Sequence, residues 1–195
     1  MPARLFVLVG HPRESSLSHG LADAYIRGAQ AEGAEVRRMN LHDMAFDPDL
    51  TDGYLKRKDH EPAITEFLEH TMWADHLAWF HPLWWGGMPG KMQGLIDRAF
   101  LPGIAFAYHK DDPWWDRLLA GRTADVFVTA DTPGFFIKWI YRNPHKNRIT
   151  KQILEFTGVK VTGYSYFSAA KTAKEAKIQA WMRKAYNRGA DAGRR

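Results

Sequence analysis

The chain has 195 residues, enough for one domain with a buried core, and 45% of them are hydrophobic. Its lack of cysteine excludes disulfides, thiolate nucleophiles and cysteine-ligated metal centres, and it fits a reducing, cytoplasmic location. The formal net charge of +5 comes from scattered basic residues, so no nucleic-acid partner is predicted, although the charge is compatible with a peripheral membrane partner.

Apolar runs alternate with helical patterns along the chain. The run Arg4–Val9 (RLFVLV) predicts a strand buried on both faces, and apolar spacing predicts a helix over Leu17–Glu32. The other expected strands are Ala34–Met39, Leu77–Phe80, Ala124–Thr129 and Val159–Phe167. The other expected helices are Ile64–Trp73, Gly90–Phe100, Asn147–Thr157 and Thr172–Arg188. This alternation predicts an α/β fold, a doubly wound, five-stranded parallel sheet with helices on both faces, in one domain spanning residues 1–195.

The segment between residues 41 and 71 interrupts the alternation. It contains the stretches DMAFDPDL and KRKDHE before its single expected helix. A connection of this length often carries function, as a lid or as part of the rim of a site. No apolar stretch of the chain is long enough to span a bilayer, so no transmembrane segment is predicted.

Ligands of open parallel sheets bind beyond the carboxyl ends of the strands, where loops meet. The first such loop, GHPRESSLSHG at residues 10–20, brings His11 and several serines to the start of a helix. Free backbone N–H groups there could hold a phosphate without a lysine, and the alternative is an ordinary serine N-cap. The loop matches neither the G-x-G-x-x-G nor the P-loop pattern, so a Rossmann dinucleotide site and NTP hydrolysis are not predicted.

Two further loops complete this edge of the sheet. PLWWGGMP, residues 82–89, sets Trp84 and Trp85 before two glycines that permit close backbone approach. A tryptophan pair that plugs the core is the alternative, disfavoured because the pair lies at a turn. ADTPGFF, residues 130–136, is a turn-forming stretch after the fourth strand. A phosphate cradle at one end and planar-ring walls at the other suit a flavin mononucleotide.

Several motifs of the chain resemble one known family. His11–Leu17 fits H-x-x-x-[ST]-S-[LF], and HPLWWGGMPGKMQGLIDRAF at residues 81–100 fits a tryptophan- and glycine-containing motif in which His81 replaces Phe. PGIAFAY at Pro102–Tyr108 and the terminal ILEFTGVKVTGYSYF fit as well. The chain resembles the flavodoxin-like NAD(P)H:quinone oxidoreductases, which include mammalian quinone reductases and bacterial potassium-efflux ancillary proteins.

The resemblance implies a flavodoxin-like sheet of strand order 2-1-3-4-5 and a bound flavin, FMN with FAD as the alternative. The residues that would hold its phosphate and ribityl end are His11, Ser16, Leu17 and Ser18. Those that would border the rings are Pro82, Leu83, Trp84, Trp85 and Gly86, with further contacts from Asp131, Thr132, Pro133 and Gly134. Tyr108 matches a family aromatic that closes the substrate pocket, commonly from the partner subunit. The catalytic Tyr/His pair of the mammalian enzymes has no clear counterpart, although Tyr141 and His145 lie nearby.

The function that this resemblance implies is a ping-pong transfer of two electrons, as hydride, from NAD(P)H through the flavin to a quinone. An azo- or nitroreductase with the same cofactor is an alternative. A flavin-binding regulatory subunit of a membrane potassium-efflux system is another, and the basic charge permits it. An electron-carrier flavodoxin is disfavoured, because those proteins are typically acidic and this chain has a pI of about 9.4.

Three further expectations follow from particular residues. The tryptophan surplus, Trp73, Trp114, Trp115 and Trp139, favours a homodimer, because interfaces are enriched in tryptophan. The histidines form no H-E-x-x-H pattern, so no metal site is predicted. Asp97 and Arg98 are expected to form an ion pair on a helix surface or in an interface, with a catalytic role as the alternative.

Overall fold

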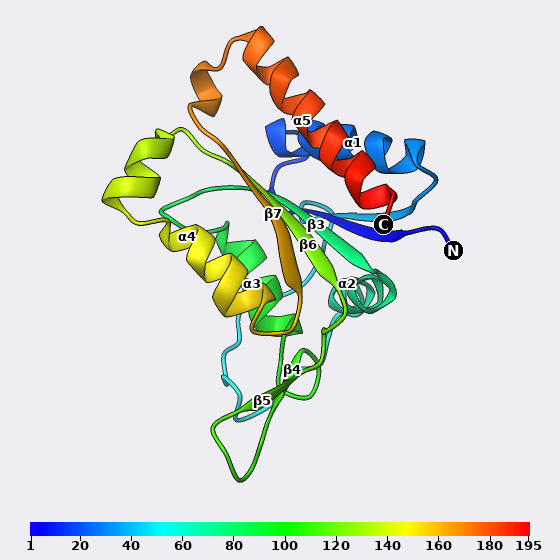
Figure 1. Ribbon diagram of the computed structural model, residues 1–195. Coiled ribbons are helices and arrows are strands. Elements are labelled where there is room, and N and C mark those ends of the chain that lie inside the picture. The colour runs from blue at the N-terminus through cyan, green and yellow to red at the C-terminus, as the bar shows by residue number, and fades with distance from the viewer.

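Five segments of the chain form one parallel sheet in the computed structural model, which describes residues 1–195 (Figure 1). The strands lie in the order β2-β1-β3-β6-β7, which is the predicted order 2-1-3-4-5 when the five sheet strands are counted alone. The predicted doubly wound, five-stranded parallel sheet is therefore confirmed. Its strands are β1 (Arg4–Val9), β2 (Glu35–Asn40), β3 (His76–Pro82), β6 (Thr123–Thr129) and β7 (Lys160–Phe167).

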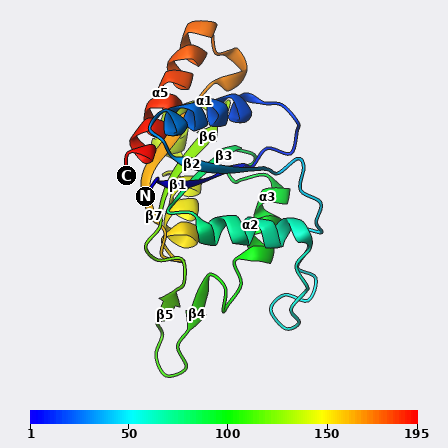
Figure 2. The ribbon, with the colours of Figure 1, turned by 90° about the vertical axis from the view of Figure 1, so that its right-hand side faces the viewer.

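Helices cover both faces of the sheet (Figure 2). Every side chain from Leu5 to Val9 in β1 is fully buried, and alternate side chains belong to two separate cores. This two-sided burial explains the uninterrupted apolar run in the sequence. One face is covered by α1 (Leu17–Ala31) and α5 (Glu175–Gly193). The other is covered by α2 (Pro62–Trp73), α3 (Gly90–Ala99), the short α4 (Pro144–Asn147) and the π-helical stretch Arg148–Leu154.

The structure also contains elements that the sequence patterns did not reveal. β4 (Phe106–Tyr108) and β5 (Trp115–Arg117) form an antiparallel pair that extends below the body of the protein in Figure 1. Strands of three residues are too short to show a periodic pattern. The helix expected at Asn147–Thr157 instead begins at Pro144 and ends at Leu154 in wide π-helical turns. Two short turns were also missed, π-helical Phe136–Ile140 and 3₁₀-helical Ala170–Thr172.

Two glycines allow α1 and α5 to meet backbone to backbone. A Cβ atom added to Gly28 would lie 2.0 Å from the carbonyl oxygen of Tyr186. A Cβ atom added to Gly189 would lie 1.9 Å from the carbonyl oxygen of Tyr25. Real Cβ atoms cannot approach a backbone atom so closely, so both positions require glycine for steric reasons.

The Gly28→Ala variant is expected to lose about 3 kcal/mol or more of unfolding free energy, because the opposing helix must move as a whole. Urea unfolding followed by circular dichroism measures this loss. Gly90→Ala is the control, since nothing lies within 4 Å of the added methyl group. Equal stabilities of the two variants would contradict the close approach of α1 and α5.

The expectation for Asp97 and Arg98 is wrong. Arg98 is fully buried, and its guanidinium donates to the carboxylate of Glu61 at 2.8 Å and to the carbonyl oxygen of Asp59 at 2.7 Å. It also donates to the carbonyl oxygen of Asp47. Asp97 instead accepts a hydrogen bond from Gln93. The arginine therefore fastens the long connection between β2 and α2 to α3, and this contact is the physical reason for its burial.

Candidate functional site

The loops that follow β1, β3 and β6 meet at the carboxyl edge of the sheet. The N–H of Leu83 donates to the carbonyl oxygen of Thr129 at 2.8 Å, which joins the second loop to the end of β6. The hydroxyl of Ser18 lies 3.4 Å from the hydroxyl of Thr129. The N–H of Gly10 donates to the carbonyl oxygen of Phe80 at 2.7 Å. Segments far apart in the sequence thus form one continuous rim, where open parallel sheets bind ligands.

The first loop leads into the amino end of α1, where backbone N–H groups are free. Ser16 occupies the N-cap position, but its hydroxyl makes no capping hydrogen bond and lies 2.8 Å from Nδ1 of His19. The N–H groups of Leu17 and Ser18 have no acceptor within the protein, as in the first turn of any helix. The helix dipole adds positive potential at this point. The arrangement therefore suits an anionic group such as a phosphate.

His11 links the first loop to the second. Its ring is buried, and its centroid lies 5.7 Å from that of Trp84 in an edge-to-face arrangement. Burial, together with the nearby charges of Arg13 and His19, lowers the pKa of His11 to about 4. Nδ1 accepts a hydrogen bond from the N–H of Arg13 at 3.1 Å. At neutral pH the ring is therefore uncharged and carries its proton on Nε2, which is a hydrogen-bond donor.

The second loop forms a tight turn that displays both tryptophans. Trp84 and Gly87 exchange two backbone hydrogen bonds of 2.9 Å, and the residues between them, Trp85 and Gly86, have φ values of 50° and 77°. Trp85 is fully exposed and Trp84 is 46% exposed, so the alternative of a tryptophan pair in the core is wrong. Left-handed backbone at a bulky residue costs of order 1–3 kcal/mol and concentrates at functional sites.

The third loop is held rigidly to the end of β7. The carboxylate of Asp131 accepts a hydrogen bond from the N–H of Lys171 at 2.7 Å, and the hydroxyl of Tyr166 donates to the carbonyl oxygen of Thr132 at 2.8 Å. Pro133 is exposed, and Gly134 is half-buried beside the Tyr166 ring. The four predicted residues of this loop therefore form a fixed, open part of the rim.

A buried histidine pair lies just behind this rim. Nδ1 of His81 donates to the carbonyl oxygen of Pro82 at 2.9 Å, and its Nε2 lies 3.3 Å from Nε2 of His145. Both rings are almost completely buried, and Nδ1 of His145 has no partner. Burial lowers the pKa of His81 to about 4 and, with the charges of His81 and Arg148, that of His145 to about 3. The sequence signalled this pair only through His81, which replaces Phe in the second motif.

Acid is expected to destabilise the protein through this pair. The unfolded chain takes up protons below its ordinary histidine pKa of about 6.5, whereas the folded pair resists them until about pH 4. The pair's contribution to stability is therefore present above pH 6.5 and falls by about 3 kcal/mol for each of the two rings as pH drops to 4. His81→Leu/His145→Leu is expected to flatten this part of a stability–pH curve measured by urea unfolding. His42→Leu, at an exposed position, is the control, and an equal slope in the two variants would contradict the prediction.

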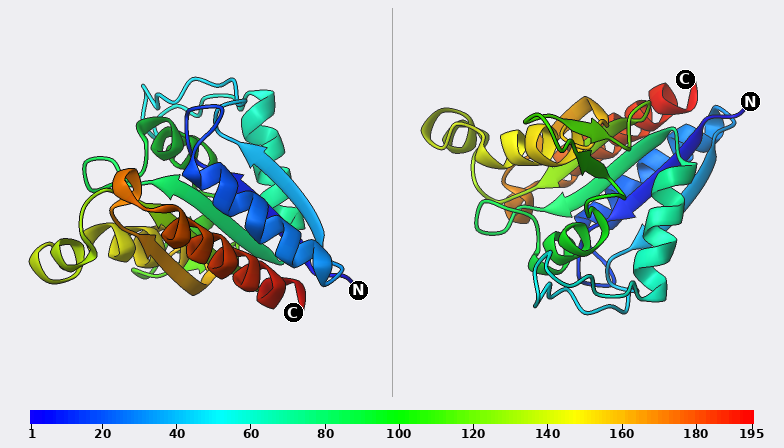
Figure 3. Two further views of the ribbon diagram at one scale, coloured as in Figure 1. Left: turned by 90° about the horizontal axis from the view of Figure 1, so that it is seen from above. Right: turned by 90° about the horizontal axis from the view of Figure 1, so that it is seen from below.

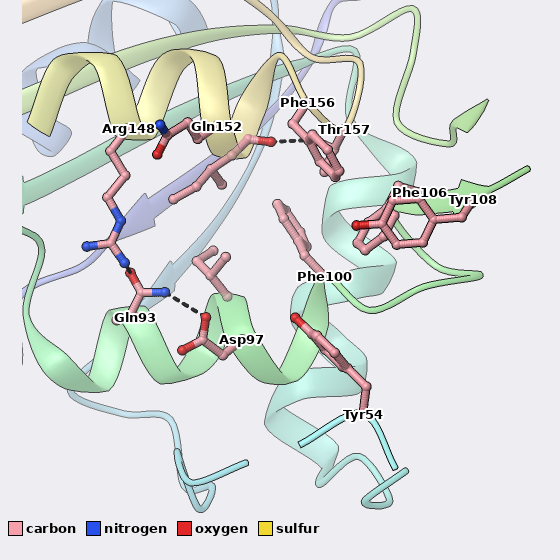
Figure 4. Close-up of a pocket in the computed structure, with 12 residues that line it drawn as sticks. Tyr54, Gln93, Asp97, Phe100, Phe106, Tyr108, Arg148, Gln152, Phe156 and Thr157 are labelled. Atoms are coloured by element: carbon pink, nitrogen blue, oxygen red, sulfur yellow. Dashed lines mark hydrogen bonds between the residues drawn. The ribbon is translucent and has the colours of Figure 1, made fainter. Parts of the chain in front are cut away.

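Tyr108 lies away from the three loops of its own chain. It is exposed on β4 and lines a cavity of about 300 Å³ that includes no residue of those loops. Figure 4 shows Tyr54, Phe100 and Tyr108 towards one end of this cavity and Arg148 at the other. A guanidinium nitrogen of Arg148 lies 3.8 Å from where a Cβ atom of Gly87 would be, so the cavity adjoins the tryptophan turn.

The structure does not assemble a Tyr/His pair near the third loop. Tyr141 is exposed, whereas His145 is buried against His81, and no hydrogen bond joins the two.

Residues 3–188 of the chain match the sequence model of a protein family that is described as having a flavodoxin-like fold. The chain belongs to this flavodoxin-like fold family. The match covers nearly the whole chain, so the resemblance read from the strand-end motifs is confirmed at the level of the family.

Relatives of this flavodoxin-like chain carry oxidoreductase names. An uncharacterised NAD(P)H oxidoreductase of Escherichia coli (strain K12) is 29% identical over 108 residues, 53% of this chain and 55% of that protein. The chain thus spans little more than half of that relative's length. The FMN-dependent NADH:quinone oxidoreductase of Ruegeria pomeroyi is 27% identical over 143 residues, 65% of this chain and 70% of that protein. The solved NAD(P)H:quinone oxidoreductase of Methanothermobacter marburgensis has a TM-score of 0.80 at 20% identity, covering 98% and 99%, which shows a shared fold.

Proposed function

We propose that this flavodoxin-like chain binds FMN and acts as an NAD(P)H oxidoreductase that reduces a quinone or a similar acceptor. One observation carries the proposal: a single rim combines free N–H groups at a helix start with an exposed tryptophan turn. FMN has the matching chemistry, a phosphate joined by a ribityl chain to flat rings. The Ruegeria relative is named as FMN-dependent, which favours FMN over the alternative, FAD.

The phosphate and ribityl end would lie at the start of α1. The free N–H groups of Leu17 and Ser18 are available donors, and the hydroxyl of Ser16, which lies within hydrogen-bond distance of Nδ1 of His19, is beside them. Uncharged His11 adds an Nε2 proton without the cost of burying a cation. Several neutral donors at a helix start bind a phosphate without any lysine, which agrees with the composition of this loop.

The rings would lie against the tryptophan turn, bordered by Pro82 and Leu83. The N–H of Trp84 donates to the carbonyl oxygen of Gly87 within the turn, so it is not available to the rings. The N–H groups of Trp85 and Gly86 have no acceptor in the protein and are free to donate to the ring edge. Such fixed dipoles stabilise negative charge on a reduced ring without reorganising. Asp131 to Gly134 would supply the facing part of the rim.

The bound flavin would accept a hydride from NAD(P)H and pass two electrons to the acceptor in a ping-pong cycle. The protein's part is to hold the rings and to stabilise their charge, so the lack of a cysteine or other nucleophile is no obstacle. We also propose a homodimer, in which the exposed Tyr108 and Trp114 of one copy face the rim of the other and close the acceptor pocket.

A reconstitution experiment tests the function. Protein stripped of small molecules is expected to bind FMN, to show flavin absorbance, and then to oxidise NAD(P)H with menadione. Failure to bind FMN, FAD or riboflavin would overturn the proposal. A panel of quinones, azo dyes and nitroaromatic compounds separates the quinone reductase from an azo- or nitroreductase. A flavin-loaded protein inactive on every acceptor would instead favour the regulatory subunit of a potassium-efflux system.

A further inference from the structure

The segment after the third loop, residues 135–148, exposes an unusual concentration of aromatic side chains; we refer to it as the aromatic–basic segment. Within it only Ile137 and His145 are buried. The exposed apolar side chains and their exposed fractions are Phe135 (58%), Phe136 (39%), Trp139 (71%), Ile140 (61%) and Tyr141 (56%). A π-helical turn normally buries its apolar face, whereas this one presents that face to solvent. Contiguous exposed apolar patches of this kind mark interaction sites.

The same part of the chain is strongly basic. Between Asp131 and Glu155 the sequence has no acidic residue, and it has the basic residues Lys138, Arg142, Lys146, Arg148 and Lys151. None of these five takes part in an ion pair of the structure, so their charge is uncompensated. The patch thus combines aromatic rings with free cations, the combination found on proteins that lie at the membrane–water interface.

The aromatic–basic segment projects from the body of the protein and is held there by defined contacts. Both views of Figure 3 show it, in yellow-green, extending beyond the end of the sheet. The chain reverses direction at Arg142 and Asn143, whose backbones are left-handed with φ values of 57° and 53°. The N–H of Asn143 donates to the carbonyl oxygen of Ile137 at 2.7 Å. The buried contact between His145 and His81 fastens its far end to β3. The segment follows the third loop directly, so it projects beside the proposed flavin site.

We propose that the aromatic–basic segment docks on an anionic lipid bilayer, with its aromatic side chains in the headgroup region and its cations on lipid phosphates. None of the helices combines the length and apolar character needed to cross a bilayer, so the contact would be peripheral. The proposed function gives this contact a purpose, and to that extent the inference rests on it. Quinones with apolar tails dissolve in the bilayer, and docking would bring the open edge of the sheet to them.

A second copy of the chain is a poorer occupant for this patch. A two-fold contact centred on this patch would set its four unpaired cations, Lys138, Arg142, Lys146 and Arg148, against the same four of the second copy. The chain also carries a net charge of +5, which adds repulsion rather than complementarity. Anionic lipid offers both the apolar layer and the opposite charge.

Vesicle sedimentation tests the proposal with the full chain. We expect binding to phosphatidylcholine vesicles containing about one-third phosphatidylglycerol and at least about tenfold weaker binding to pure phosphatidylcholine, because each basic residue near an anionic surface adds severalfold to partitioning. Lys138→Gln/Arg142→Gln/Lys146→Gln is expected to lose at least about tenfold. Lys171→Gln/Lys174→Gln/Lys177→Gln, the same charge change near the start of α5, is the matched control.

The aromatic contribution is tested separately. Trp139→Ser/Tyr141→Ser is expected to weaken vesicle binding at least about fivefold, whereas Trp114→Ser, at a tryptophan of similar exposure on the β4–β5 pair, is expected to change it little. No vesicle binding by the parent protein, or equal losses in test and control variants, would overturn the inference. So would a native mass that falls from dimer to monomer in Trp139→Ser/Tyr141→Ser, since this would assign the patch to a second copy.

This experiment separates the inference from the proposed function. Reduction of menadione, a quinone without an apolar tail, reports the flavin chemistry alone when vesicles are absent. It is expected to be unchanged in Lys138→Gln/Arg142→Gln/Lys146→Gln and in Trp139→Ser/Tyr141→Ser. Vesicle binding by a protein that fails to take up flavin would uphold the docking surface and overturn only the oxidoreductase proposal. A protein that reduces menadione but does not bind anionic vesicles would uphold the oxidoreductase proposal and overturn the docking surface.

Discussion

The Ser16→Asp variant is expected to keep its fold and to bind FMN at least about 100-fold more weakly than the parent protein. Aspartate is as good an N-cap as serine, so α1 should be as stable as before or more so. Its carboxylate would, however, stand where we place the flavin phosphate, and two like charges at close range in a partly buried site repel strongly. The free N–H groups of Leu17 and Ser18 would then serve the carboxylate rather than the phosphate.

Ser16→Asn is the matched control, because asparagine caps equally well and has nearly the same shape without the charge. Fluorescence titration of both variants with FMN measures the difference, and we expect the asparagine variant to stay within about tenfold of the parent. Riboflavin lacks the phosphate, so its affinity should hardly distinguish the two variants. Equal FMN affinities in Ser16→Asp and Ser16→Asn would show that the flavin phosphate does not bind at the start of α1.

The Arg98→Met variant is expected to lose about 2 to 4 kcal/mol of unfolding free energy. Methionine fills much of the same space, but it removes the guanidinium that donates to the carboxylate of Glu61 and to the carbonyl oxygens of Asp47 and Asp59. Arg98→Lys keeps the charge, but the single ammonium group of lysine cannot reach all the acceptors that the planar guanidinium reaches. We therefore expect an intermediate loss of unfolding free energy. Urea unfolding measures both, and a stability like that of the parent in Arg98→Met would contradict the role of this contact.

The same contact predicts an acid dependence. Burial alone would raise the pKa of Glu61, but hydrogen bonds from Arg98 and from the N–H of Asp47 lower it to about 2. Because the folded pKa lies below the ordinary value, this stabilisation is present above about pH 4.5 and is lost as pH falls towards 2. Arg98→Met should therefore show a weaker loss of stability over that acid range than the parent does.

The sheet was predictable because its signals are local. A strand buried on both faces must be apolar at every buried position, so the run Leu5–Val9 can be recognised without knowledge of its neighbours. A helix with one buried stripe has its own period, and α1 and α3 were found within a residue or two of their ends. Since parallel strands end at one edge, the three loops of the rim followed from the strands.

The site needed the tertiary structure for its details. Glycines next to Trp85 suggested a turn, but the left-handed backbone of Trp85 itself depends on the two hydrogen bonds between Trp84 and Gly87. The neutral state of His11 depends on its burial, which no local pattern reports. The partners of His81 and Arg98 come from residues 64 and 37 positions away in the chain.

The sequence by itself determined the parallel sheet, its alternation with helices and the family to which the chain belongs. These follow from side-chain periodicity and short motifs, which are properties of neighbouring residues. Only the tertiary structure decided that Arg98 is buried, that His81 meets His145, and that the rings of residues 135–141 face solvent. Such outcomes depend on which distant groups can satisfy a charge or a hydrogen bond, and packing alone brings those groups together.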